Sequence, residues 1–139
     1  DMTGAEIIKV LNEGLDYAQG ISASTGAFPY SAGLRYDVTL GAAEGSGIQN
    51  VDVRDENGDW APIVDSQTYS VATNSFTGQG KDGYDTFAEV QAADPDAFED
   101  SNVAYVVPLL EYFREELPDQ TLPALDATDY CLKSVADQR

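Results

Sequence analysis

The chain has 139 residues, 42% of them apolar, which is enough for one domain with a buried core, and no apolar run is long enough to span a bilayer. Its 25 acidic and 7 basic residues give a formal net charge of −18, which argues against a broad basic face that binds nucleic acid or an anionic membrane. The absence of histidine excludes serine–histidine triads, cysteine–histidine pairs and histidine-containing metal centres within this chain.

One helix and two strands are predicted in the first part of the chain. Thr3 and Glu6 have the spacing of a capping box, and apolar residues then recur at helical spacing, which predicts a helix from Gly4 to about Ala18. Residues 33–40 alternate apolar and polar side chains as a half-buried strand does, and residues 48–53 indicate a second strand. No signal peptide is visible, and we expect the start to be a cut inside a longer protein.

A turn is predicted at residues 55–59. The pair Asn57-Gly58 is a strong signal for a hairpin between two strands. The same acidic segment also resembles a calcium loop, but an EF-hand register with Gly58 at its sixth position places Val53 and Val64 at the first and twelfth ligand positions. We therefore interpret the segment as a turn.

A β-rich run and a short helix follow the turn. Residues 68–73 are rich in residues that favour strands, and a short helix is expected from Tyr84 or Asp85 to about Val90. Residues 94–100 are acidic and interrupted by a proline, so we expect a solvated loop there.

A second amphipathic helix is expected after Ser101 or Asn102. Its apolar face is formed by Val106, Leu109, Leu110, Phe113 and Leu117. We interpret this stripe as core and not as a cofactor site. Residues 118–139 are expected to form an extended tail that packs on the domain formed by residues 1–117. The lone Cys131 is interpreted as a packed or linking residue, because no base lies near it in the sequence.

The segment with the strongest functional signal is the loop from Thr73 to Tyr84, which follows a predicted strand. It contains an aromatic ring, Phe76, and a carboxylate, Asp82. Its glycines are Gly78, Gly80 and Gly83. Glycines allow positive φ and close approach to a ligand, the ring offers a stacking face, and the carboxylate can accept hydrogen bonds from hydroxyls. A plain strand-to-helix turn would be compatible with the same glycines.

Four segments of the chain resemble the carboxy-terminal domain of the 5′-nucleotidase and UDP-sugar hydrolase family. They are Met2–Glu6 at the start of a helix, Gly33–Tyr36, Thr68–Asn74 and the end of the loop at Lys81–Tyr84. The resemblance covers about residues 2–115, and its most specific part is the asparagine, phenylalanine, glycine-rich, Asp-Gly-aromatic sequence. It implies an α+β fold in which helices pack on a mixed sheet.

Proteins of this family pair an amino-terminal metallophosphatase domain, which holds two divalent metal ions, with a carboxy-terminal domain that binds the nucleotide. The resemblance implies that this chain belongs to the second domain, that it has no cofactor and no catalytic residue of its own, and that the protein is periplasmic, secreted or attached to the cell surface. It implies a nucleoside or nucleotide as ligand. Phe76 matches one of two rings that stack on the base, and Asp82 matches an aspartate that hydrogen-bonds the ribose hydroxyls.

Two departures from the family pattern affect the expected site. The family often has paired glycines before the aspartate, whereas Gly80 is followed here by Lys81, which would be strained if its φ were positive. Lys81 is either a cation beside an anionic ligand or a solvated side chain. The second stacking ring of the family lies upstream of Asp1, and Phe28 is assigned to packing.

Two alternatives to a nucleoside-binding domain of a 5′-nucleotidase stay open. One is a stand-alone binding module without a nucleotide site, and the other is a relative that acts on UDP-sugars, cyclic nucleotides or sulfur compounds.

Overall fold

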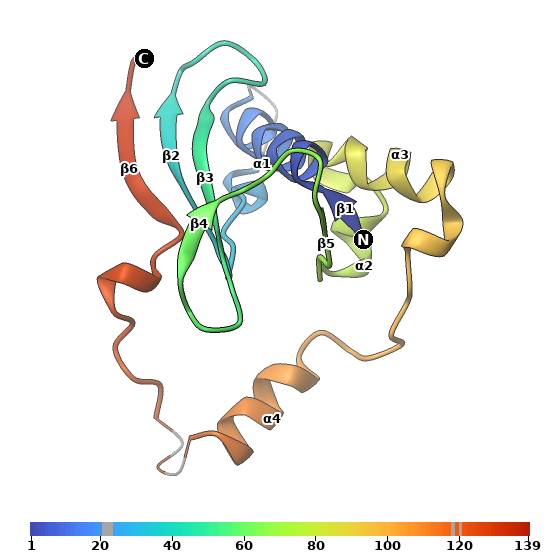
Figure 1. The fold of residues 1–139 in the computed structure, drawn as a ribbon, viewed down its shortest axis with the longest axis vertical. Coiled ribbons are helices and arrows are strands. Elements are labelled where there is room, and N and C mark those ends of the chain that lie inside the picture. Colours follow the sequence, from blue (N-terminus) through green and yellow to red (C-terminus); the bar gives the residue numbers. More distant parts are fainter. Residues whose placement is uncertain (21–23, 118, 120) are drawn as a thin grey trace.

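A computed structural model describes residues 1–20, 24–117, 119 and 121–139 (Figure 1). In chain order its strands are β1 (Met2–Thr3), β2 (Leu34–Leu40), β3 (Ile48–Arg54), β4 (Trp60–Pro62), β5 (Thr68–Tyr69) and β6 (Leu132–Asp137). Its helices are α1 (Gly4–Gln19), α2 (Ser75–Gly78), α3 (Asp85–Ala93) and α4 (Val107–Glu115). Four 3₁₀ turns complete the described elements: η1 (Thr25–Ala27), η2 (Lys81–Gly83), η3 (Pro95–Ala97) and η4 (Ala127–Asp129).

The larger sheet is mixed and has the strand order β4-β3-β2-β6. β2, β3 and β4 form antiparallel neighbours, whereas β6 lies parallel to β2 at the edge. A second, two-stranded sheet pairs β1 with β5 in antiparallel register. Helices packed on a mixed sheet confirm the predicted α+β fold class.

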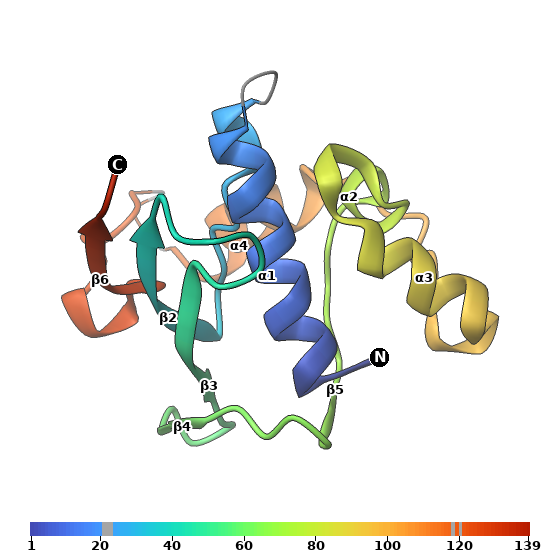
Figure 2. The same ribbon diagram turned by 90° about the horizontal axis from the view of Figure 1, so that it is seen from above.

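Helix α1 lies between the larger sheet and the α2–α3 pair (Figure 2). Its capping box forms as predicted, because the Glu6 amide donates to the Thr3 hydroxyl and the Thr3 amide donates to the Glu6 carboxylate at 2.7 Å. The Thr3 amide and the Thr3 hydroxyl both donate to the Glu6 carboxylate, and these two hydrogen bonds hold the pKa of Glu6 below its ordinary value. The core lies between α1 and the sheet, where Leu15, Tyr36 and Val38 are almost fully buried.

A buried amide joins α1 to the sheet. Asn12 is 3% exposed, and its side chain accepts a hydrogen bond from the Ile48 amide at 2.8 Å and donates to the Ile8 and Ile48 carbonyls. All of the polar atoms of this side chain are therefore paired, which is the condition for burying an amide without a large loss of stability. The contact fixes the position of α1 along β3.

The predicted hairpin is present, with β3 and β4 antiparallel and Gly58 at a φ of +89° in the turn between them. One element of the tail was not expected. Residues 132–137 form β6, which lies beside β2 and is mostly exposed. The sequence did not predict this strand because its pairing partner is far away in the chain, with Tyr36 opposite Leu132 and Leu40 opposite Asp137. Pro118 and Gln120 of the expected tail lie outside the described residues.

The interpretation of the apolar stripe on α4 as core is wrong. No residue of α4 is buried, and Figure 1 shows the helix apart from α1, α3 and the larger sheet. Leu109 and Leu110 are 52% and 45% exposed. The helical spacing correctly indicated that one face of this helix is apolar, but periodicity does not identify the surface that covers such a face.

Candidate functional site

The candidate loop begins with a capped helical turn. The Asn74 side chain accepts a hydrogen bond from the Thr77 amide at 2.9 Å and donates to the Thr77 hydroxyl, which starts α2. Phe76 lies in this turn and is 56% exposed. A large aromatic side chain that exposed contributes little to the core, so its ring is available for contact with a ligand or a partner.

The second half of the loop contains three residues with positive φ. Gly80 has a φ of +77°, Asp82 a φ of +56° and Gly83 a φ of +80°. Lys81 does not have a positive φ, so the strain that a positive φ would cause there is absent, and the non-glycine residue in the left-handed region is its neighbour Asp82. This conformation costs an L-residue roughly 1–2 kcal/mol, although aspartate tolerates it better than most residues. Such strain is found most often where a side chain must be held in a particular place for function.

Close packing on two sides holds Gly80 and Gly83. A Cβ atom at Gly83 would lie 2.8 Å from Cβ of Tyr17 on α1, and one at Gly80 would lie 2.9 Å from Cβ of Ala88 on α3. Only glycine combines positive φ with such close neighbours. Asp82 therefore lies between two glycines that α1 and α3 fix in position.

The end of the loop is anchored by Tyr84, which is 8% exposed. Its hydroxyl donates a hydrogen bond to the Ala27 carbonyl at 2.7 Å and lies over Gly14, where a Cβ atom would come within 2.4 Å of the oxygen. Burial, and secondarily the negative charge of Asp82, raise the pKa of Tyr84 to about 12, so the phenol stays protonated as a donor. Neither Gly14 nor Tyr17 was predicted to contact the loop, although a glycine inside a helix indicates close approach of another group.

The side chains of Asp82 and Lys81 have no partner among the described residues and are therefore available to a ligand. Asp82 is partly exposed, and its carboxylate makes no hydrogen bond or ion pair with any of them. Lys81 is exposed, and no acidic group within the described ranges pairs with it. α2 contacts η2, so the loop brings the Phe76 and Asp82 segments together.

Gly78 differs from the other loop glycines. It is buried, but its φ is not positive, and a Cβ atom there would be at ordinary contact distance, 3.4 Å from Thr73 and 3.5 Å from Phe98. The structure therefore gives a conformational reason for glycine at positions 80 and 83 but none at position 78.

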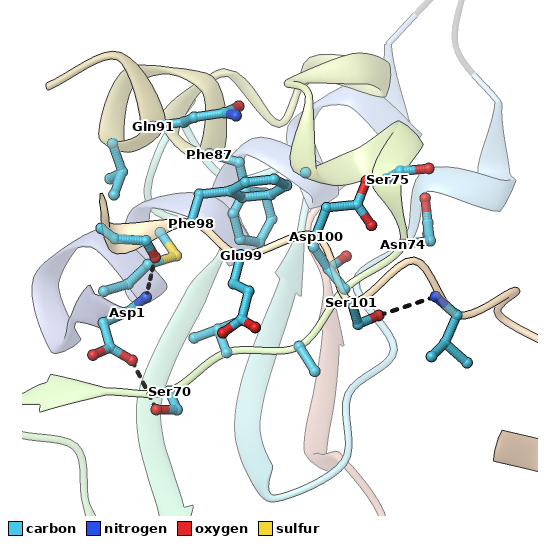
Figure 3. A pocket seen from close by; sticks show the side chains of 18 of the residues that line it. Asp1, Ser70, Asn74, Ser75, Phe87, Gln91, Phe98, Glu99, Asp100 and Ser101 are labelled. Carbon is cyan, nitrogen blue, oxygen red and sulfur yellow. Dashed lines mark hydrogen bonds between the residues drawn. The ribbon is translucent and has the colours of Figure 1, made fainter. Parts of the chain in front are cut away.

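An open groove lies beside the loop, and neither Phe76 nor Asp82 lines it. Its volume is about 790 Å³, and it lies between the segment after β5, α3 and residues 96–108 (Figure 3). Asn74, Ser75 and Gly78 line its edge. The groove contains several carboxylates and no lysine or arginine, so its electrostatics do not favour a phosphate group.

The described residues contain no group of three or more acidic or cysteine side chains that could hold a metal ion, and histidine is absent from the whole chain. None of the described helices is both long and apolar enough to cross a membrane.

Comparison with known proteins identifies the family. Residues 1–89 match the family described as 5′-nucleotidase, C-terminal domain. The chain is 37% identical over 91 residues to a probable 5′-nucleotidase of Treponema pallidum and 40% identical over 91 residues to the NAD 5′-nucleotidase of Haemophilus influenzae. These matches cover 65% and 64% of this chain but only 15% of each relative, so the chain spans a small part of their length.

Two solved structures have the same fold. The NAD nucleotidase of Haemophilus influenzae superposes with a TM-score of 0.82 and 31% identity over 97% of this chain, which corresponds to 23% of that protein. A 5′-nucleotidase precursor from Thermus thermophilus superposes with a TM-score of 0.52 and 32% identity over 65% of this chain and 17% of that one. The chain belongs to the 5′-nucleotidase C-terminal domain family.

Proposed function

We propose that this member of the 5′-nucleotidase C-terminal domain family is the nucleoside-binding part of a two-domain, metal-dependent phosphohydrolase that acts on nucleoside phosphates. The observation that supports this most directly is the conformation of Asp82. It lies in the left-handed region between two tightly packed glycines, and its carboxylate is unpaired among the described residues, in the same loop as the exposed Phe76.

The two side chains match the two halves of a nucleoside. A ring such as Phe76 stacks on the face of a base for roughly 1–3 kcal/mol and tolerates different bases. An ionised carboxylate such as Asp82 can accept hydrogen bonds from both hydroxyls of a ribose, which favours an intact vicinal diol. Lys81, exposed beside Asp82, is proposed to lie near the phosphate end of a nucleotide.

The metal chemistry of the proposed enzyme does not belong to this chain. With no histidine in the sequence and no suitable acidic cluster among the described residues, its side chains do not fit a site for two divalent metal ions. We assign those ions to an amino-terminal metallophosphatase domain of the longer protein. This chain then positions the nucleoside, and alone it does not hydrolyse nucleotides.

The nucleotidase names of the matched relatives support a nucleotide substrate. The test is a titration of the isotope-labelled chain with adenosine and with AMP, followed by amide shifts. We expect shifts concentrated between Phe76 and Tyr84, with millimolar affinity, because the chain supplies only one of the two expected rings. Phe76→Leu keeps an apolar side chain but removes the aromatic face, and it should weaken adenosine binding about fivefold or more.

Two results would contradict the proposal. Unchanged amide shifts in this loop at saturating adenosine would favour a binding module that kept the fold without a nucleotide site. Turnover of AMP by the purified chain with added manganese or zinc would show that catalysis does not need a separate domain.

A further inference from the structure

The short sheet formed by β1 and β5 has an unpaired continuation. β5 pairs with β1 only over Thr68 and Tyr69, yet Figure 2 shows the chain running straight on from β5 to α2. The backbone groups of residues 70–73 make no hydrogen bond with any described residue, and their side chains are exposed. An unpaired backbone of this kind is a template for a further strand.

The register of this sheet indicates which segment fits. The Gly4 amide donates to the Gln67 carbonyl at 2.9 Å, and Met2 faces Tyr69, so these are the hydrogen-bonded pairs of an antiparallel ladder. The pair that follows Met2 and Tyr69 in this register is Asp1 and Ser70, which is a close pair without backbone hydrogen bonds. The Ser70 hydroxyl donates to the Asp1 carboxylate at 2.7 Å.

The ladder can continue only through residues on the amino-terminal side of Asp1. In the same register, the residue before Asp1 faces Val71 as a hydrogen-bonded pair, and the second residue before Asp1 faces Ala72 as a close pair. β1 would then extend along the whole segment from Tyr69 to Thr73.

The adjacent groove has the chemistry of a surface that packs against such a strand. Its apolar lining includes Val71, Phe87, Phe98 and Val103, and two of these, Val71 and Val103, are 38% and 52% exposed. Asp1 and Glu99 line the groove, where the Asp1 carboxylate accepts a hydrogen bond from the Ser70 hydroxyl (Figure 3). The lining contains no lysine or arginine side chain, which disfavours an anionic ligand. Apolar and uncharged side chains of a strand would bury this surface.

A longer protein of known structure shares the fold of this chain. The NAD nucleotidase structure superposes on 97% of this chain, although the matched part is only 23% of that protein. Helix α4 lies apart from the core with its apolar face exposed. This position is compatible with a longer protein in which additional residues pack beside α4.

We infer that residues 70–73 and the adjoining groove are the docking surface for the strand that immediately precedes Asp1 in the longer protein, paired antiparallel in the register of β1 and β5. The inference rests on the proposed function in one respect, since it needs a protein longer than this chain. It does not depend on the ligand or the reaction.

A disulfide in the longer protein tests the register. In a background where Cys131 and any other cysteine are serine, Ala72→Cys is combined with a cysteine at the second residue before Asp1. These two positions form a close pair in the proposed ladder, within the Cα separation that a disulfide bridges. We expect a disulfide under mild oxidation, identified by mass spectrometry of non-reduced peptides.

The matched control moves one cysteine by a single residue, to Val71→Cys, so that its side chain points to the opposite face of the ladder. Little crosslinking is expected in this variant, and equal crosslinking in both variants would overturn the register. Hydrogen exchange without mutation provides a second readout. The amides of Val71 and Thr73 should exchange at least about tenfold more slowly in the longer protein than in this chain.

Two further outcomes are decisive. Equal exchange rates in the two proteins would overturn the inference. Protection of the same amides in this chain alone, together with a dimer in sedimentation, would also overturn it by showing that a second copy occupies the edge. A longer protein that forms the disulfide but does not hydrolyse AMP would support the docking surface and contradict the proposed function, so the two failures are distinguishable.

Discussion

Replacing Asp82 by glycine is expected to separate stability from binding. The φ of +56° costs an L-residue roughly 1–2 kcal/mol, and the smaller figure applies to aspartate. Glycine removes that strain but adds roughly 0.5–1 kcal/mol of unfolded-state entropy. The two effects nearly cancel, so Asp82→Gly should be as stable as the wild type within about 1 kcal/mol. Asp82→Ala keeps the strain without the polar group and should be less stable than Asp82→Gly by about 1 kcal/mol.

The binding effect of both substitutions is expected to be the same. Each removes the carboxylate, and with it up to two charge-assisted hydrogen bonds to the ribose hydroxyls, together worth about 2–3 kcal/mol. Adenosine should therefore bind about 30–150-fold more weakly to both variants. Removing the hydroxyls from the ligand should have a similar effect on the wild type, whereas both variants should bind adenosine and 2′,3′-dideoxyadenosine equally.

The assays are urea unfolding for stability and amide-shift titration for binding. A difference of 1 kcal/mol between the glycine and alanine variants corresponds to a shift of roughly 0.3–1 M in the urea midpoint. Adenosine affinity within about twofold of the wild type in Asp82→Gly would refute the role of the carboxylate. An alanine variant more stable than the glycine variant would refute the explanation from backbone conformation.

The close contact of Gly83 with Tyr17 predicts that Gly83→Ala loses about 2 kcal/mol or more in urea unfolding, because it combines positive φ with a Cβ contact of 2.8 Å. Gly78→Ala, at ordinary contact distances, is the matched control and should change stability by less than about 1 kcal/mol. The capping box predicts that Thr3→Ala costs about 1 kcal/mol at pH 7. Because the pKa of Glu6 is lowered on folding, its contribution is present above the ordinary value of 4.5 and is lost as the pH falls through the folded pKa, so Glu6→Gln should flatten the acid side of a stability–pH curve. An unchanged acid limb in that variant would contradict the account.

Local signals explain which parts of the fold could be predicted from the sequence. The start of α1 depends on side chains three residues apart, and the β3–β4 hairpin depends on an Asn-Gly pair whose glycine supplies positive φ. Both elements formed where expected. Strand β6 lacks such a signal because its hydrogen bonds are made with β2, far away in the chain, and its side chains are mostly exposed.

The candidate site was predictable in its residue types but not in its backbone. The sequence indicated that Phe76, Asp82 and glycines share one loop, but it placed the doubtful backbone position at Lys81. The positive φ at Asp82 results from packing of the loop against α1 and α3, and no local pattern specifies those contacts. Glycine at position 14 was the one local indication that the loop end approaches the helix.

The contacts that hold the loop all come from within this chain, whereas the groove beside it is open. Tyr17, Tyr84 and Ala88 fix the loop glycines without help from any preceding strand. Docking of that strand should therefore leave the conformation of Asp82 unchanged. It should still improve affinity, because we expect the second ring of the proposed nucleoside site upstream of Asp1. Asp82→Asn should thus weaken nucleoside binding by the same factor in the longer protein as in this chain, although the unsubstituted longer protein binds more tightly. A much smaller factor in the longer protein would mean that the upstream segment, and not the glycine-framed carboxylate, recognises the ribose.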